Sequence, residues 1–175
     1  KRDEDNMLKI TTDGRKCALD VRLIDMSGLE VSPDRSAGDK VTACADKLCE
    51  LYLAYPGTCQ MVFSDIGTPN SGFNVYDALK AELVLRGVPA SEVAFVHDAT
   101  SESARNKLFA AVNAGRIRVI IGSTFKLGMG VNAQEKLIAL HHLSVPWRPS
   151  DMVQREGRIM RPGNTCGEVF IFRYV

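Results

Sequence analysis

Two arginines and a glutamine near the C-terminal end have the spacing of a phosphate-binding clamp. Gln154, Arg158 and Arg161 lie in the stretch PSDMVQREGRIMRPGN, residues 149–164. If residues 149–161 form a helix, at about 100° per residue, these three side chains share one face. Arginine provides planar, permanently charged donors, which suit binding a polyphosphate and stabilising a transferring phosphoryl group. The three are therefore candidate catalytic residues.

The same helical spacing predicts an apolar stripe on the opposite face, made of Met152, Val153, Ile159 and Met160. Arg155 points to one side of the glutamine and arginines. An ordinary solvated helix also carries arginines opposite an apolar stripe. Gly157 counts against that interpretation, because glycine within a helix costs about 1 kcal/mol relative to alanine. Its expected use is close approach by another backbone or a ligand.

A second candidate site follows the apolar run at residues 118–122. Small hydroxyls, a lysine and glycines after a buried strand suit phosphate binding through side-chain and backbone donors. The candidate residues of this loop are Ser123, Thr124, Lys126, Gly128, Gly130 and Asn132. A third polar loop begins at Ser64, after residues 60–63, and is equally well explained as a plain connection.

Short apolar runs alternate with helical segments in the second half of the sequence. The predicted strands are residues 60–63, 93–96, 118–122, 137–140 and 168–174, and the predicted helices are residues 75–86, 101–114 and 149–161. This alternation predicts an α/β fold with a parallel sheet covered on both faces. Ligands of such sheets bind at the carboxyl ends of the strands, where the candidate loops lie.

The first part of the chain is predicted to be a helical lead-in. Residues 7–12 read as a short extended piece, residues 14–24 and 39–55 as helices, and residues 25–38 as a loop. The helices have no strands of their own. We therefore divide the chain into a lead-in, residues 1–56, packed on a main domain, residues 57–175.

The arginine segment resembles motif VI of superfamily-two helicases and translocases, whose form is Gln-x-x-Gly-Arg-x-x-Arg. The match consists of Gln154, Gly157, Arg158 and Arg161, and the ending at Asn164 is similar to the Swi/Snf-like branch, with Asn in place of Gln. The loop after residue 122 resembles motif V, and residues 62–64 resemble motif IV. The order of three motifs over residues 60–174 is more specific than any one of them.

The resemblance implies a RecA-like second helicase lobe and a role for each candidate. Arg158 and Arg161 would be arginine fingers acting on ATP, with Gln154 orienting the site. Ser64, Ser123, Thr124 and Lys126 would contact the nucleic-acid backbone, and Gly128, Gly130 and Asn132 would face the nucleotide. Trp147 lies where the family carries a turn that sets the finger helix, although a tryptophan there by default fills the edge of the core.

The sequence lacks a Gly-x-x-x-x-Gly-Lys-Ser/Thr loop and an Asp-Glu-x-His run. A phosphate clamp without these parts does not hydrolyse ATP alone. We therefore expect ATP and Mg²⁺ to be held mainly by an N-terminal RecA-like lobe of a longer parent, with DNA as the other partner. The N-terminal segment loosely resembles large bacterial helicases of mobile elements, some of which are fused to methylases.

The composition is that of an ordinary globular domain. The 175 residues are 45% hydrophobic and 25% charged, and a net charge of +1 creates no field that would attract nucleic acid by itself. Five cysteines without Cys-x-x-Cys spacing indicate reduced thiols in the cytoplasm. We expect no metal site and no membrane span.

Three other functions stay open at this point. The first is an RNA helicase lobe, and the second is a non-catalytic RecA-like interaction module whose arginines only stabilise an interface. The third is a dinucleotide binder, because residues 128–133 (GMGVNA) satisfy Gly-x-Gly-x-x-Gly/Ala. That pattern requires a strand directly before it and an acidic residue after the next strand, and the sequence provides neither.

Overall fold

The computed structural model describes residues 7–24, 39–128 and 132–174, so the predicted loop at residues 25–38 lies outside the described residues. Within them, five strands form one sheet in the order β2-β3-β1-β4-β5. The strands are β1 (Cys59–Phe63), β2 (Val93–Phe95), β3 (Val119–Gly122), β4 (Leu137–His142) and β5 (Phe170–Arg173). Every neighbouring pair is parallel, which confirms the predicted fold class.

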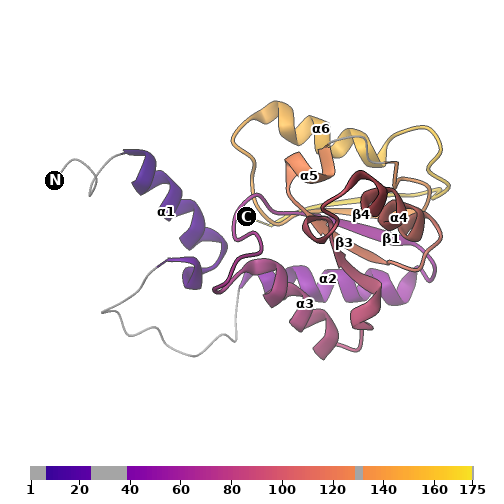
Figure 1. The fold of residues 1–175 in the computed structure, drawn as a ribbon, viewed down its shortest axis with the longest axis horizontal. Coiled ribbons are helices and arrows are strands. Elements are labelled where there is room, and N and C mark those ends of the chain that lie inside the picture. Colours follow the sequence, from indigo (N-terminus) through magenta and orange to yellow (C-terminus); the bar gives the residue numbers. More distant parts are fainter. Residues whose placement is uncertain (1–6, 25–38, 129–131, 175) are drawn as a thin grey trace.

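Helices cover both faces of this sheet (Figure 1). On one face, α2 (Lys40–Ala54) and α3 (Val75–Leu85) share a core with Val62 and Ile121. On the other face, α4 (Glu102–Asn113), α5 (Thr124–Gly128) and α6 (Pro149–Ile159) contribute to a second core around Phe63. The described residues also form three short 3-10 turns: Val21–Leu23, Ala90–Glu92 and Val96–Asp98.

Side-chain caps set the starts of three long helices. The carboxylate of Asp39 accepts from the backbone N–H of Val41, and the Ser101 hydroxyl accepts from that of Ala104. Asn74 caps α3 in the same way through the N–H of Asp77. These polar residues satisfy amide groups that the first helical turn leaves without partners, so the predicted helix starts in this region are correct to within a residue or two.

The loop after β3 differs from the prediction because it contains the short helix α5. Leu127, on this helix, is fully buried. A Cβ atom on Gly122 would lie 2.6 Å from Cγ of Leu127, so only glycine at the end of β3 allows this helix to fold back onto the sheet. Close packing therefore shapes the loop that carries Thr124 and Lys126.

The prediction for the first segment was wrong, because residues 7–12 are helical and belong to α1 (Met7–Leu19). The hydroxyl of Thr11 donates to the carbonyl oxygen of Met7, 2.7 Å away, which satisfies a β-branched residue within the helix. Leu19 is the buried residue of this helix. Near its C-terminal end, Arg15 donates to the carbonyl of Val145 and stacks on Trp147, 4.3 Å from the ring centroid.

Trp147 is therefore not a plug at the edge of the core, since 61% of it is exposed. The other lead-in helix, α2, is part of the same hydrophobic core as the sheet. The division of the chain at residue 56 stays a prediction. None of the described helices has the length and apolarity needed to cross a membrane.

Candidate functional site

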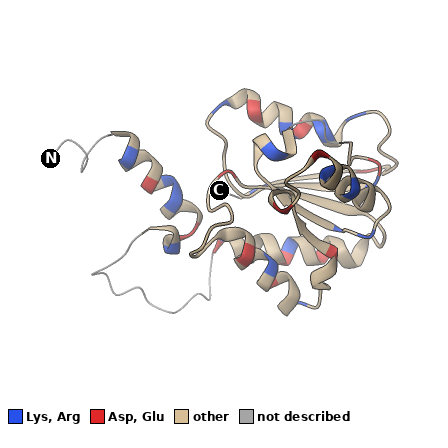
Figure 2. Cartoon of the chain, viewed as in Figure 1, with Lys and Arg blue, Asp and Glu red and all other residues tan. Residues whose placement is uncertain are grey.

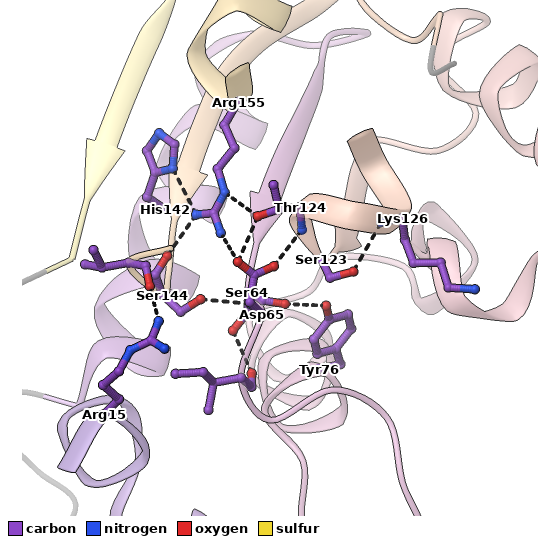
Figure 3. Close-up of polar contacts among 12 residues, drawn as sticks. Arg15, Ser64, Asp65, Tyr76, Ser123, Thr124, Lys126, His142, Ser144 and Arg155 are labelled. Atoms are coloured by element: carbon purple, nitrogen blue, oxygen red, sulfur yellow. Dashed lines mark hydrogen bonds and ion pairs between the residues drawn. The ribbon is translucent and has the colours of Figure 1, made fainter. Parts of the chain in front are cut away.

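The candidate residues gather at the carboxyl ends of β1, β3 and β4, where α6 lies against the loops that follow these strands (Figure 3). Ser64 and Asp65 follow β1, Thr124 begins α5 just after β3, and Ser144 follows β4. Parallel strands bring these ends to one edge of the sheet. Sequence reasoning expected this gathering of loops but not the way in which α6 joins them.

Arg158 is buried at the contact between α6 and α5. It is only 6% exposed, and its Nη2 atom donates to the carbonyl oxygen of Gly128 at 2.7 Å. Burial lowers the pKa of Arg158, and the nearby positive charge of Arg161 acts in the same direction. The guanidinium still stays charged near neutral pH, because the ordinary pKa of arginine is above 12.

The predicted apolar stripe of α6 is wrong. Val153 and Met160 are 71% and 65% exposed, whereas Arg155 and Arg158 are buried together with Ile159. Helical spacing placed the residues correctly around the axis, but hydrophobicity chose the wrong face. Carbonyl and carboxylate oxygens at the strand ends compensate the buried guanidinium groups.

Gln154 and Arg161 are exposed. Within the described residues, neither side chain has a hydrogen bond or an ion pair, so both are available to a ligand. The helix ends at Ile159, two residues before the predicted end, and Arg161 lies in the turn that follows. Asn164 fixes this turn, because its Nδ2 atom donates to the carbonyls of Ile159 and Leu137 at 3.0 and 2.9 Å.

The glycine-rich stretch is only partly described. Gly128 ends α5 and accepts from Arg158, and the exposed Asn132 accepts from Asn113 through its backbone carbonyl at 2.7 Å. Gly130 lies outside the described residues. A Cβ on Gly157 would meet no atom within 4 Å, so the expected approach of another backbone does not occur among the described residues, and open space lies beside this glycine.

The four predicted nucleic-acid contacts fall into two groups. Ser64 is fully buried and donates to the carbonyl of Ile66 at 2.7 Å, and the Thr124 hydroxyl donates to Asp65 at 2.8 Å. Ser123 and Lys126 are partly exposed, with the Ser123 hydroxyl accepting from the backbone N–H of Lys126 at 3.3 Å. In Figure 3 the Lys126 side chain points away from the buried contacts around Asp65.

Arg155 is the residue that sequence reasoning missed. It is fully buried, and its guanidinium reaches the loops after β1, β3 and β4. The sequence contains one signal for such a residue. Asp65 follows a buried strand directly, and a carboxylate that folding brings partly out of water needs a cation nearby. No spacing rule identifies which of the many arginines of the chain supplies it.

Charges of both signs lie along α6, as Figure 2 shows, so this surface has no single-sign field. Within the described residues, no group of three or more histidines, cysteines or acidic residues is arranged to hold a metal ion. The helix α6 and the turn after it thus offer amide and guanidinium donors, with no such cluster of acidic residues among the residues that the structure describes.

A family model described as "Helicase conserved C-terminal domain" matches residues 44–163. The match includes every candidate residue discussed above. The chain belongs to the helicase C-terminal domain family. The match begins inside α2, which agrees with the packing of this helix in the core of the domain.

Solved helicase structures share the fold of this helicase C-terminal domain. The C-terminal part of the Fun30 ATPase domain aligns with a TM-score of 0.58 and 21% identity over 75% of this chain and 39% of that chain. The helicase MrfA bound to DNA aligns with a TM-score of 0.55 and 17% identity, over 76% of this chain and 18% of that chain. The Pyrococcus furiosus Hef helicase domain aligns with a TM-score of 0.51 and 14% identity, over 76% of this chain and 24% of that chain. These likenesses support the RecA-like fold.

One curated relative matches a shorter segment of this helicase C-terminal domain. Defense against restriction protein B of Escherichia phage P1 is 34% identical over 68 residues, which is 39% of this chain and 3% of that protein. The chain thus spans less than half the length of each protein named here.

Proposed function

We propose that this domain is the C-terminal lobe of a DNA-dependent helicase or translocase of the Swi/Snf-like branch. In the proposal, ATP lies between this lobe and an N-terminal lobe that holds most of the nucleotide and Mg²⁺. The observation that carries it is the contact of Arg158 with Gly128, which fixes a charged guanidinium beside the glycine-rich stretch. Arg161 extends the cationic edge into solvent.

Arg158 and Arg161 would stabilise the charge that develops on the γ-phosphate, and Gln154 would orient the site. The exposure of Gln154 and Arg161 supports this role, since both side chains have free donors. The open space beside Gly157 lets a nucleotide approach the helix between them. Gly128, Gly130 and Asn132 would face the nucleotide from the other side.

The loops after β1 and β3 would hold the nucleic-acid backbone without reading bases. Lys126 and Ser123 are the accessible donors for a phosphate there. Ser64 and Thr124 would contribute only where a phosphate replaces their partners Ile66 and Asp65. The MrfA structure contains DNA, which supports DNA as the substrate, and an RNA substrate is the alternative.

A parent protein from a mobile genetic element fits the phage relative, whose name refers to defence against restriction. The proposed parent is a large bacterial helicase of a mobile element that acts in the cytoplasm. Direction of movement, and strand separation as opposed to translocation along a duplex, are properties of the complete motor.

The test is ATP hydrolysis by the parent protein, with double-stranded DNA, single-stranded DNA or RNA, for the wild type and Arg158→Ala. Loss of an arginine finger is expected to lower turnover by about a thousandfold or more. Arg116→Ala is the matched control, because Arg116 is exposed just before β3, at the opposite edge of the sheet. It should retain wild-type turnover.

A non-catalytic interaction module is the second candidate, and one observation favours it. The guanidinium of Arg158 already has a partner within the domain, the carbonyl of Gly128, so it contributes to folding whether or not ATP binds. Nucleic-acid-stimulated hydrolysis that survives Arg158→Ala in a folded protein would show that the arginine is structural and would favour this second candidate.

A further inference from the structure

Arg155 is the centre of a buried polar cluster that no phosphate contact explains. Its Nη2 lies 2.6 Å from Oδ2 of Asp65, and its Nε donates to the hydroxyl of Thr124 at 2.8 Å. Its Nη1 donates to the carbonyl of Ser144 at 2.8 Å and lies 3.3 Å from Nδ1 of His142. Every nitrogen of the guanidinium therefore has a partner in the cluster.

Asp65 and Thr124 complete the cluster through bonds of their own (Figure 3). Oδ1 of Asp65 accepts from the backbone N–H of Thr124 at 2.6 Å, and Oδ2 accepts from the Thr124 hydroxyl at 2.8 Å. The backbone N–H of Asp65 donates to the Ser144 hydroxyl at 2.8 Å. Loss of the ion pair between Arg155 and Asp65 would leave a buried guanidinium without its carboxylate, so this contact is costly to break.

The helix α6 forms hydrogen bonds with both ends of α5. Arg155 bonds to Thr124, the first residue of α5, and Arg158, one turn later on α6, bonds to Gly128, the last. The two arginines hold α5 against α6, and Lys126 lies between the two attachment points. A force that displaces α5 through Lys126 is therefore transmitted to the helix that carries Arg158.

We propose that Arg155 is a positioning residue that couples the nucleic-acid loops to the arginine pair, Arg158 and Arg161. This inference rests on the proposed function. Arg155 itself touches neither ATP nor nucleic acid. It fixes the loops after β1, β3 and β4 to α6, so that nucleic acid bound at Ser123 and Lys126 sets the position of Arg158. The consequence is that stimulation of ATP turnover by DNA depends on Arg155.

The experiment measures the stimulation ratio of the parent protein, which is its ATP turnover with saturating DNA divided by that without DNA. DNA affinity is measured separately by fluorescence anisotropy. Arg155→Lys keeps the positive charge but cannot reach several partners at once. We expect this variant to lose stimulation by about tenfold, with DNA affinity changed less than threefold.

Thr124 offers a second pair of variants if Arg155→Lys does not fold. Thr124→Val removes the hydroxyl at nearly constant volume, and Thr124→Ser keeps it between Arg155 and Asp65. We expect valine to lower the stimulation ratio and serine to restore it. Arg173→Gln is the control, because it removes a surface ion pair with Glu156 on the same helix while leaving the cluster intact.

The outcomes separate this inference from the proposed function. A wild-type parent without nucleic-acid-stimulated hydrolysis overturns both. A stimulated wild type whose Arg155→Lys and Thr124→Val variants fold and keep the full ratio overturns the coupling role alone. Parallel loss of stimulation and DNA affinity in Arg155→Lys also overturns it, because the loops would then serve binding only.

Discussion

Two neighbouring histidines on β4, His141 and His142, face opposite sides of the sheet and occupy very different surroundings. His141 lies in a chain of uncharged groups. Its Nε2 is 3.0 Å from Oε1 of Gln60, and its Nδ1 is 2.8 Å from the Tyr174 hydroxyl. An amide oxygen only accepts, so Nε2 carries the hydrogen and Nδ1 accepts from Tyr174. Gln60 then donates to the carbonyl of Leu48 at 2.8 Å.

His142 lies beside charged groups instead. Its Nδ1 is 3.3 Å from Nη1 of Arg155, and its Nε2 is 3.3 Å from the carboxylate of Glu156. Both histidines are almost completely buried. The series of hydrogen bonds that includes His141 ends at the backbone carbonyl of Leu48, inside the core, where no ligand can reach it. The groups around His142 belong instead to α6, a helix with exposed donors. Two equally buried histidines can thus belong to different regions, one to the closed core and the other to the inner side of a candidate site.

The largest effect is expected on the charged side, around His142, from Asp65→Ala, because this variant leaves the buried charge of Arg155 without its carboxylate. We expect a loss of about 3–5 kcal/mol in the free energy of unfolding, measured by chemical denaturation of this chain. Asp46→Ala is the control, because Asp46 pairs with Arg86 at the surface with 64% of its side chain exposed, and should cost less than about 1 kcal/mol. Equal losses of unfolding free energy in Asp65→Ala and Asp46→Ala would contradict the view that the buried ion pair matters more than the surface pair.

On the uncharged side, Gln60→Leu removes both bonds of the glutamine at similar volume. Nε2 of His141 and the carbonyl of Leu48 then lose their partners. The expected cost is about 1–3 kcal/mol in the same denaturation experiment, smaller than for Asp65→Ala because no net charge is stranded. A cost above that of Asp65→Ala would show that the neutral chain, and not the charged cluster, dominates stability.

Acid should weaken both sides. Burial lowers the pKa of His141 to about 3; burial, followed by the charge of Arg155, lowers that of His142 to about 4. The unfolded chain takes up protons below its ordinary pKa of about 6.5 while the folded chain does not, so stability falls as the pH drops from about 6.5 towards 4.

Between pH 6.5 and 5.5 the expected loss is roughly 1 kcal/mol for each of the two histidines. Denaturation midpoints at the two pH values measure it. Burial also lowers the pKa of His97, which adds in the same direction. His142→Gln should therefore reduce the pH dependence without abolishing it. Stability that is constant over this range in the wild type would contradict the buried, neutral state of both side chains.

Much of the fold was predictable, because strands that are buried on both faces of a parallel sheet consist of continuous runs of apolar residues. The predicted strand at residues 137–140 matches β4 except that the strand continues through His141 and His142. The two histidines also read as part of a strand-like run, but their contacts with Gln60 and Arg155 were not predictable, because these partners come from other elements of the fold. The extended piece at residues 7–12 was wrong because these residues form the first turns of α1, whose one buried residue, Leu19, lies at the far end of the helix.

The site was predictable as a set of loops and a helix, but not as a network. Helical spacing grouped Gln154 with Arg158, yet one is exposed and the other buried. A rule that places charge outside cannot anticipate a guanidinium whose partners come from three different loops. The assignments of Arg158 and Arg161 to ATP, and of Lys126 to nucleic acid, stay predictions until the parent protein is assayed.

The position of β5 in the chain has a consequence for synthesis on the ribosome. All six residues of β4 are buried, and one hydrogen-bonding edge of this strand pairs with β5, which follows α6 in the sequence. At about 5–20 residues per second, the nascent chain carries β4 as an unpaired apolar edge for on the order of seconds. This edge is paired only after β5 has been made, and Tyr174, the residue after β5, then completes the hydrogen bonds of His141.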